Sequence, residues 1–340
     1  MTAALCLGVL FFLVLPVLIL AWLLSCVIRE YRGDRVPILL YHRLIRRADA
    51  RQGFVSDEEM IWVVYEDSFA AQMALLREAG YRTLDLDEYL EIRAGSAPLP
   101  PRPIIITFDD GYQSNYALAY PELRRNGFRA TIFVAPEPDA ETRELIEGID
   151  GFLSEAQLRE MSENRISIQS HGLTHRILTE LDDEEVRREL LASKTRLEAI
   201  TGRKVDHLAI PRAGYSRKIR RFASEAGYRT VCANNKGSAS GLSSPMALPR
   251  IVVERDMTIE EFRDYCLGPR GALALRILGN LKRIPERIGG ARFAQRMREL
   301  LYQPPLRQLF STAALKKIAA VGGLVYAAAA VVFWVHVLAS

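Results

Sequence analysis

Two adjacent carboxylates, Asp109 and Asp110, directly follow an apolar run at 104–108 and precede a glycine. Two like charges at this spacing repel each other, and burying either one is costly unless a positive group offsets it. A solvated turn is one explanation, because Asp-Gly is a common turn pair. A metal or catalytic site is the other, since one carboxylate can bind a cation while its neighbour takes a proton from water.

The segment ISIQSHGLTH at 166–175 adds His171 and His175, four residues apart. Two imidazoles at this spacing can face one cation, although two surface histidines give the same pattern. The chain has only five histidines, and these two come just after a second apolar run. With the acidic pair they predict a metal site of two histidines and one aspartate, the second aspartate being a base. Zinc suits this ligand set best, and cobalt, nickel or iron also fit it.

Alternating strands and helices are needed to bring these residues together. We predict mostly apolar strands, typical of strands covered on both faces, at 38–41, 104–108, 130–135, 166–170, 208–211 and 230–233. Helices are predicted between them, one beginning at Ser154 with Gln157 in a capping box and another at 183–200. The phrases AGYRT, NGFRA and AGYRT indicate helix ends with a left-handed glycine at 79–83, 126–130 and 226–230.

This alternation predicts an α/β fold, either a distorted (β/α) barrel or, as the alternative, an open doubly wound sheet. In both folds, the side chains that do chemistry gather at the carboxyl ends of the strands. The acidic pair and the two histidines each follow a predicted strand, so we expect them to meet at that end.

The charge distribution separates the carboxyl-terminal part from the rest of the chain. The net charge is +4, but 270–317 contains eleven Lys or Arg and only two acidic residues. We predict a basic juxtamembrane helical segment there, because a basic block beside an apolar end is typical of contact with a membrane rather than with nucleic acid. None of the four cysteines forms a CxxC pair, so the sequence indicates neither a disulfide framework nor a thiolate zinc site.

Both ends of the chain are apolar, since 1–28 and 318–340 contain no charged side chain. Each is long enough to cross a bilayer, and we predict transmembrane helices at 3–28 and 318–339. A cleaved signal peptide and a buried amphipathic helix are the respective alternatives. Lys and Arg flank both stretches only on the side of the central domain, which predicts an inner-membrane protein with that domain on the cytoplasmic face. An extracytoplasmic domain is the alternative.

The sequences TFDDG and SHGLTH together resemble the first two motifs of the NodB-type polysaccharide deacetylases. The segments VPILLYHRL at 36–44 and DSFAAQMALLREAGYRTLDLDEYL at 67–90 resemble the branch that acts on poly-N-acetylglucosamine. The resemblance covers 36–262 and implies a barrel of the polysaccharide deacetylase type, for which we expect a catalytic domain at 36–265.

The resemblance also implies roles for individual residues. Asp109 matches the general base, and Asp110, His171 and His175 match the metal ligands. The family's late histidine motif is missing after Arg250, and the early Tyr-His pair of the poly-N-acetylglucosamine branch makes His42 the expected general acid.

The third family motif is degenerate in this chain. It is represented by AIPRAGYS at 209–216, where Pro211 matches and Arg212 occupies the position of an aromatic residue. The resemblance implies that a backbone N–H here stabilises an oxyanion. A backbone donor is retained when the side chain changes. Arg212 can contact an anionic group or simply be solvated, and Arg250 matches an arginine that orients the base.

Together these observations predict a metal-dependent de-N-acetylase of N-acetylated amino sugars, in a polysaccharide or a lipid-linked glycan. The alternatives are a non-catalytic carbohydrate-binding or assembly protein on the same fold, or a deacylase of another N-acyl or O-acyl group. The expected partners are the glycan and the membrane, without nucleic acid.

Overall fold

The computed structural model describes residues 14–50, 62–147 and 150–282. The chain divides into two compact units, of which Ile28–Arg276 contains every strand in the described residues. The other unit consists of Met1–Val27 and Ile277–Ser340, and only residues 14–27 and 277–282 of it are described.

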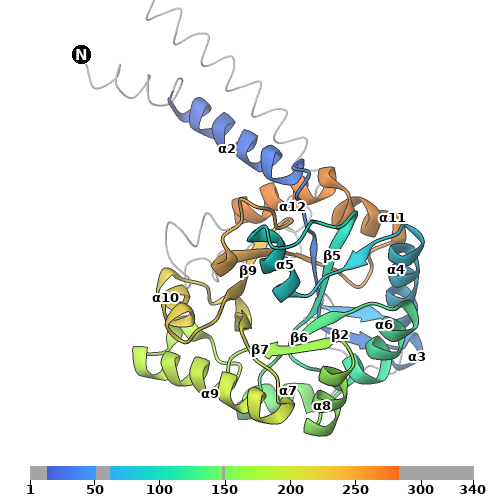
Figure 1. Ribbon diagram of the computed structural model, residues 1–340, viewed down its shortest axis with the longest axis vertical. Coiled ribbons are helices and arrows are strands. Elements are labelled where there is room, and N and C mark those ends of the chain that lie inside the picture. Colours follow the sequence, from blue (N-terminus) through green and yellow to red (C-terminus); the bar gives the residue numbers. More distant parts are fainter. Residues whose placement is uncertain (1–13, 51–61, 148–149, 283–340) are drawn as a thin grey trace, which may run out of the picture. The chain divides into compact units, whose positions relative to one another are not determined.

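A closed ring of parallel strands forms the centre of the larger unit (Figure 1). β1 pairs with β10 on one side and with β5 on the other, so the described sheet has no free edge within the ring. The ring consists of β1 (Ile38–Tyr41), β5 (Pro103–Phe108), β6 (Ala130–Val134), β7 (Ile166–Ser170), β8 (His207–Ala209), β9 (Thr230–Lys236) and β10 (Leu248–Val252). This closure confirms the predicted barrel and excludes the open sheet.

The bounds of β1, β5, β6 and β7 lie within one residue of the prediction, whereas β9 extends to Lys236, three residues past its predicted end. β8 ends at Ala209 and a 3-10 turn, Pro211–Ala213, follows, because proline has no N–H to donate to a strand ladder. Four strands in the described residues were not predicted: β10, the short β4 (Arg82–Thr83), which pairs with β5 outside the ring, and the pair β2 and β3 at 43–45 and 63–65.

Helices of the larger unit surround the strands of the ring, and a two-stranded parallel sheet lies beside them (Figure 1). The small sheet consists of β2 (Arg43–Ile45) and β3 (Val63–Tyr65). The α-helices are α2 (Leu15–Glu30), α3 (Arg47–Ala50), α4 (Glu66–Glu78), α5 (Leu86–Arg93), α6 (Tyr120–Asn126), α7 (Ala140–Glu147), α8 (Glu155–Glu163), α9 (Asp183–Thr201), α10 (Arg217–Glu225), α11 (Ile259–Glu261) and α12 (Pro269–Lys282).

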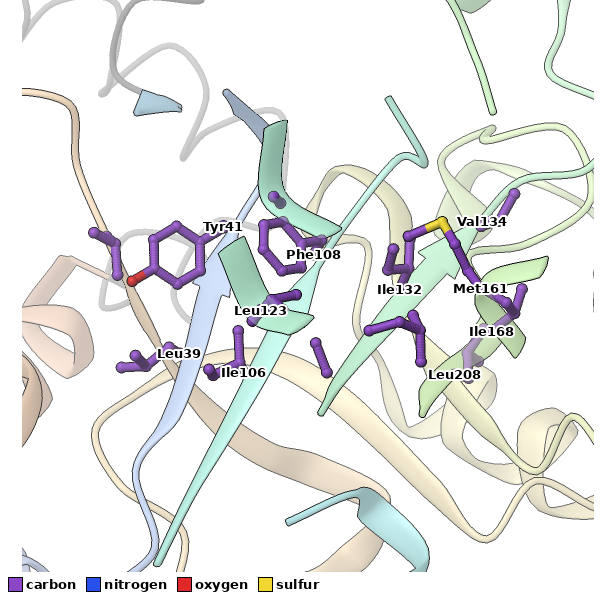
Figure 2. Close-up of a cluster of buried hydrophobic side chains, with 14 of the residues drawn as sticks. Leu39, Tyr41, Ile106, Phe108, Leu123, Ile132, Val134, Met161, Ile168 and Leu208 are labelled. Carbon is purple, nitrogen blue, oxygen red and sulfur yellow. The ribbon is translucent and has the colours of Figure 1, made fainter. Parts of the chain in front are cut away.

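Side chains along the strands alternate between two buried clusters, as expected of a strand covered on both faces. The larger cluster joins outward strand residues to the helices, as Leu39 and Ile106 are joined to Leu123 of α6 (Figure 2). The smaller one contains the intervening residues, such as Ile105 and Phe133, inside the ring. Because Phe108 belongs to the outer cluster, the next residue, Asp109, points inward.

The three predicted helix ends are confirmed. Gly80, Gly127 and Gly227 all have a left-handed φ, between 71° and 81°. In each case the following aromatic residue donates its N–H to a carbonyl of the last helical turn, as Tyr228 does to Ala223 at 2.9 Å. The capping box at Ser154 and Gln157 is also present at the start of α8.

No helix in the described residues has the length and hydropathy of a membrane span. Residues 15–28 of the first apolar stretch belong to α2, which has 16 residues. Residues 3–13 of the predicted first span, residues 283–317 of the basic segment and the whole predicted span at 318–339 lie outside the described residues. The structure therefore does not support the flanking transmembrane helices.

Gly227→Ala should lower the free energy of unfolding by about 1–2 kcal/mol, because its φ of 81° places an alanine in the left-handed region. Gly33→Ala is the matched control, since no atom lies within 4 Å of the added methyl group and its φ is outside that region. Urea unfolding of both variants measures the difference. Equal stabilities would contradict the assigned helix end.

Candidate metal centre and active site

The predicted site residues come together at the carboxyl ends of the ring strands. His42 follows β1, Asp109 and Asp110 follow β5, and His171 follows β7. Arg250 lies within β10, whose neighbour in the ring is β1. The site is thus built from strands that are far apart in the sequence and that the closed barrel brings together at one end.

Asp110, His171 and His175 form a cluster with the geometry of a metal centre. Their candidate ligand atoms all lie within 4.8 Å of one another. The Nε2 atoms of His171 and His175 are 3.2 and 3.1 Å from Oδ1 of Asp110. Ligand atoms bound to a tetrahedral zinc ion lie about 3.3 Å apart, so the three side chains fit a divalent metal.

The orientation of His171 also fits a metal ligand. Its Nδ1 lies 2.9 Å from the carbonyl oxygen of Ala209, which can only accept a hydrogen bond. Nδ1 therefore carries a proton, and in the neutral ring Nε2 presents its lone pair to the cluster. The backbone N–H of His171 donates to Val134 at 2.9 Å, which fixes the start of the loop.

Asp110 and His175 reach the cluster through unusual backbone conformations. Their φ angles are 73° and 68°, in the left-handed region that residues other than glycine seldom occupy. Such strain persists only where the surroundings enforce it, and it is frequent at functional sites. Burial opposes ionisation of Asp110, but the contacts with the His171 and His175 rings, when these rings are protonated at Nε2, outweigh burial and hold the pKa of Asp110 well below the usual value.

Asp109 is separated from the metal cluster by its pairing with Arg250. The guanidinium Nη1 and Nη2 atoms each donate to one carboxylate oxygen at 2.7 Å, and both residues are 3% exposed. Burial alone would raise the pKa of Asp109, but the Arg250 charge outweighs burial, and the pKa lies below its usual value. The structure thus places Arg250 where it can orient Asp109, as predicted.

His42 lies near both carboxylates but keeps one nitrogen without a partner. Its Nδ1 atom is buried and makes no hydrogen bond within the described residues. Asn115 holds the backbone of this segment by donating to the His42 carbonyl oxygen at 2.8 Å. Burial lowers the pKa of His42, although the charges of Asp110 and Asp109 oppose that shift. The exposed ring of Trp62 lies 5.1 Å from the His42 ring.

Pro211 and Arg212 follow β8 at the same end of the barrel. Arg212 has a left-handed φ of 46°. Its guanidinium lies 3.4 Å from both Glu141 and Thr142, and Thr142 in turn lies 3.4 Å from Nδ1 of His175. Arg212 is therefore separated from a candidate metal ligand by a single side chain.

The remaining histidines do not join the site. His207 is buried at the start of β8, the opposite end of the barrel, with Nδ1 2.9 Å from Thr230. His336 lies outside the described residues. Sequence reasoning missed Asn115 and Thr142, which contact site residues, because nothing in their local sequence marks them.

Comparisons with known proteins agree with this fold. Residues 96–231 match the family model for polysaccharide deacetylases. The chain is 28% identical over 241 residues to YxkH of Bacillus subtilis, which is named after the same family, covering 71% of this chain and 79% of that protein. A 53-residue stretch, 16% of this chain, is 43% identical to 8% of the poly-beta-1,6-N-acetyl-D-glucosamine N-deacetylase of Escherichia coli.

Solved structures share the architecture. The Streptococcus pyogenes deacetylase PplD, in complex with acetate, aligns with a TM-score of 0.60 at 23% identity, covering 68% of this chain and 98% of that one. BC0361, a polysaccharide deacetylase from Bacillus cereus, aligns with a TM-score of 0.56 at 25% identity, covering 67% of each chain.

Arg250→Met should lower the free energy of unfolding by about 3–5 kcal/mol at pH 7, because it leaves Asp109 buried without its counter-charge. In the wild type the lowered pKa of Asp109 gives stability that is present above the unfolded-state pKa and lost as pH falls through the folded pKa. The variant's Asp109 has a raised pKa instead, so the stability difference should shrink as pH falls from 7 to 4.5.

Urea unfolding at the two pH values checks this expectation. Arg46→Met is the control, since Arg46 forms a solvent-exposed pair with Glu66 at 3.4 Å and should contribute less than about 1 kcal/mol. A pH-independent difference between Arg250→Met and the wild type would contradict the assigned role of the pair.

Proposed function

We propose that the chain is an amide hydrolase of the polysaccharide deacetylase type, a metal-dependent de-N-acetylase of N-acetylated amino sugars, which is supported by the family match over 96–231 and by the similarity to YxkH. The products are a free amine on the sugar and acetate. The observation that carries this proposal is the separation of the two adjacent carboxylates, one held by Arg250 and the other by two histidines.

Asp110, His171 and His175 are the residues that would hold the metal. Zinc fits their two nitrogens and one oxygen best, and cobalt, nickel or iron are alternatives. A bound divalent metal supplies Lewis acidity, which polarises the acyl carbonyl and makes water a stronger acid.

In this proposal Asp109 takes the proton from the attacking water. Its lowered pKa keeps the carboxylate ionised at neutral pH, although the same shift makes it a weaker base. The bidentate contact with Arg250 fixes the plane of the carboxylate. Asp109 is therefore proposed to act as a base because it is held in position and is ionised before the reaction, and not because its basicity is high.

His42 is proposed as the acid that protonates the leaving nitrogen, because an amine leaves poorly without a proton. It lies at the end of β1, next to the strand that carries Asp109. The charges of Asp110 and Asp109 favour its protonated form against the effect of burial. Base and acid are thus supplied from two adjacent strand ends.

The turn after β8 is proposed to stabilise the oxyanion. Pro211 has no N–H, so of the two residues proposed here only Arg212 has a backbone donor. Its left-handed conformation determines where that N–H points. A backbone donor is independent of the side chain, which explains how arginine can replace the family's aromatic residue.

The substrate is proposed to be a polysaccharide of N-acetylglucosamine or a lipid-linked glycan with N-acetylated sugars. The local similarity to an enzyme named for poly-beta-1,6-N-acetyl-D-glucosamine supports the first. The cationic side chain of Arg212, 32% exposed at the site, supports an anionic group such as the phosphate of a lipid-linked sugar. Incubation with both substrates, followed by mass spectrometry for the loss of acetyl groups, distinguishes them.

Asp109→Asn should lower the rate of acetate release from oligomers of β-1,6-linked N-acetylglucosamine by about 10²–10⁴-fold, because water loses its proton acceptor. It should still bind one equivalent of metal, whereas His171→Ala should lose metal and activity together. Acetate release and metal content are measured on the same samples. Asp256→Asn, at an exposed ion pair, is the control, and a wild-type rate for Asp109→Asn would exclude Asp109 as the base.

We also propose that the protein is anchored in the inner membrane at both ends, with the barrel on the cytoplasmic face. The support is the sequence pattern of two apolar ends flanked by Lys and Arg on the side of the barrel. The basic residues of 270–317 would then lie on anionic lipid, with about 1 kcal/mol from each well-placed Lys or Arg. Arg276 is the exception, because it is buried and paired with Glu30 at 2.6 Å.

A cysteine introduced at exposed Ser96 should resist a membrane-impermeant thiol reagent in intact cells and react after lysis. The wild-type chain is the control and gives the background labelling of its own four cysteines, of which Cys26, Cys232 and Cys266 are buried and Cys6 lies outside the described residues. A phosphatase fusion after residue 340 should be active, since that end would lie outside the cytoplasm. Labelling of Ser96→Cys in intact spheroplasts would instead place the barrel outside.

A further inference from the structure

The loop between the two candidate metal-binding histidines is held by a buried carboxylate from another element. Glu189 of α9 is 4% exposed. Its Oε2 accepts hydrogen bonds from the backbone N–H groups of Leu173 at 2.9 Å and Thr174 at 3.0 Å. Its Oε1 accepts a hydrogen bond from the Thr174 hydroxyl at 2.5 Å.

These contacts are specific to the loop. A buried carboxylate is stable only when charges or hydrogen bonds satisfy it. No Lys, Arg or His in the described part of the chain forms an ion pair with Glu189, so the three donors of the loop take that place. The carboxylate and the loop therefore depend on each other.

Ser193, one turn further along α9, holds the other side of the same loop. Its hydroxyl donates to the Gly172 carbonyl oxygen at 2.8 Å and lies 2.8 Å from the Ser170 hydroxyl. A methyl group at Gly172 would lie 3.4 Å from both Glu189 and Pro211. The loop is thus tightly enclosed from Ser170 to Thr174.

We propose that Glu189 is a positioning residue that sets the metal affinity of the site by fixing the loop between His171 and His175. This inference rests on the metal site of the proposed function. His175 has a left-handed φ of 68°, and it directly follows Thr174, the residue with two hydrogen bonds to Glu189. Without these bonds the chain can relax toward ordinary backbone angles, which would move His175 away from Asp110.

The proposed role of Glu189 depends on the hydrogen bonds that its side chain accepts and not on its negative charge. Glutamine has the same length as glutamate, its carbonyl oxygen can accept both backbone hydrogen bonds, and its amide can face the Thr174 hydroxyl. Glu189→Gln should therefore preserve the loop, whereas Glu189→Ala removes all three hydrogen bonds. Thr174→Val removes only the hydroxyl contact.

Titration of the purified full-length protein with Co²⁺, followed by visible absorption, tests the proposal. Glu189→Ala should bind Co²⁺ about 10–100-fold more weakly than the wild type, the range found for groups that orient metal ligands. Glu189→Gln should rescue the affinity, and Thr174→Val should lie between. Glu184→Ala, on the same helix but 87% exposed, is the control. Thermal unfolding in EDTA verifies that each variant is folded.

Unchanged Co²⁺ affinity in folded Glu189→Ala would overturn the proposal. If that variant does not fold, Thr174→Val decides: weaker binding supports the positioning role and wild-type binding overturns it. A wild-type protein that binds Co²⁺ but releases no acetate would refute the proposed reaction. The positioning role of Glu189 would then still be decided by the Co²⁺ affinities of the variants relative to the wild type. A wild-type protein without Co²⁺ binding would overturn both.

Discussion

The buried pair of Asp109 and Arg250 is the interaction on which the rest of the site depends. Two neighbouring carboxylates cannot both remain charged in a nearly dry site unless each has its own positive or hydrogen-bonding partners. Arg250, within β10, donates two hydrogen bonds of 2.7 Å to Asp109. This contact keeps one carboxylate ionised and away from the histidines, and leaves the other to face them.

The geometry of the barrel explains why Asp109 and Asp110 face different partners. Alternate side chains of a strand point in opposite directions, so Asp109 continues the inward row of β5 while Phe108 packs outward. Asp110 leaves that pattern by adopting a left-handed conformation, which directs it to His171 and His175. Closure of the ring brings β10 beside β1, and β1 beside β5. Arg250 thereby reaches Asp109 across 141 residues of chain.

Much of the fold and of the candidate site could be predicted from the sequence. The remaining features depend on tertiary contacts, which no local sequence pattern shows. Asp110, His171 and His175 were predictable as one site because each follows an apolar strand, and such strand ends converge. The strand pattern alone favoured the barrel without excluding an open sheet, since closure depends on the pairing of β1 with both β5 and β10, which no local pattern encodes; the resemblance to the deacetylases implied the barrel. Glu189 was missed because its partners lie on a loop 15–16 residues earlier, where only the tertiary fold brings them into contact. The side of the membrane rests on sequence statistics alone.

The central claim is that the adjacent carboxylates have different partners, Asp110 the metal and Asp109 the arginine. A crystal structure of the zinc-loaded protein, with the metal located by anomalous scattering, tests it most directly. We predict zinc bound to Asp110, His171 and His175 at about 2.0–2.2 Å, with Asp109 still paired to both Arg250 nitrogens. A metal bridged by both carboxylates, or bound to Asp109 with Arg250 displaced, would contradict the account.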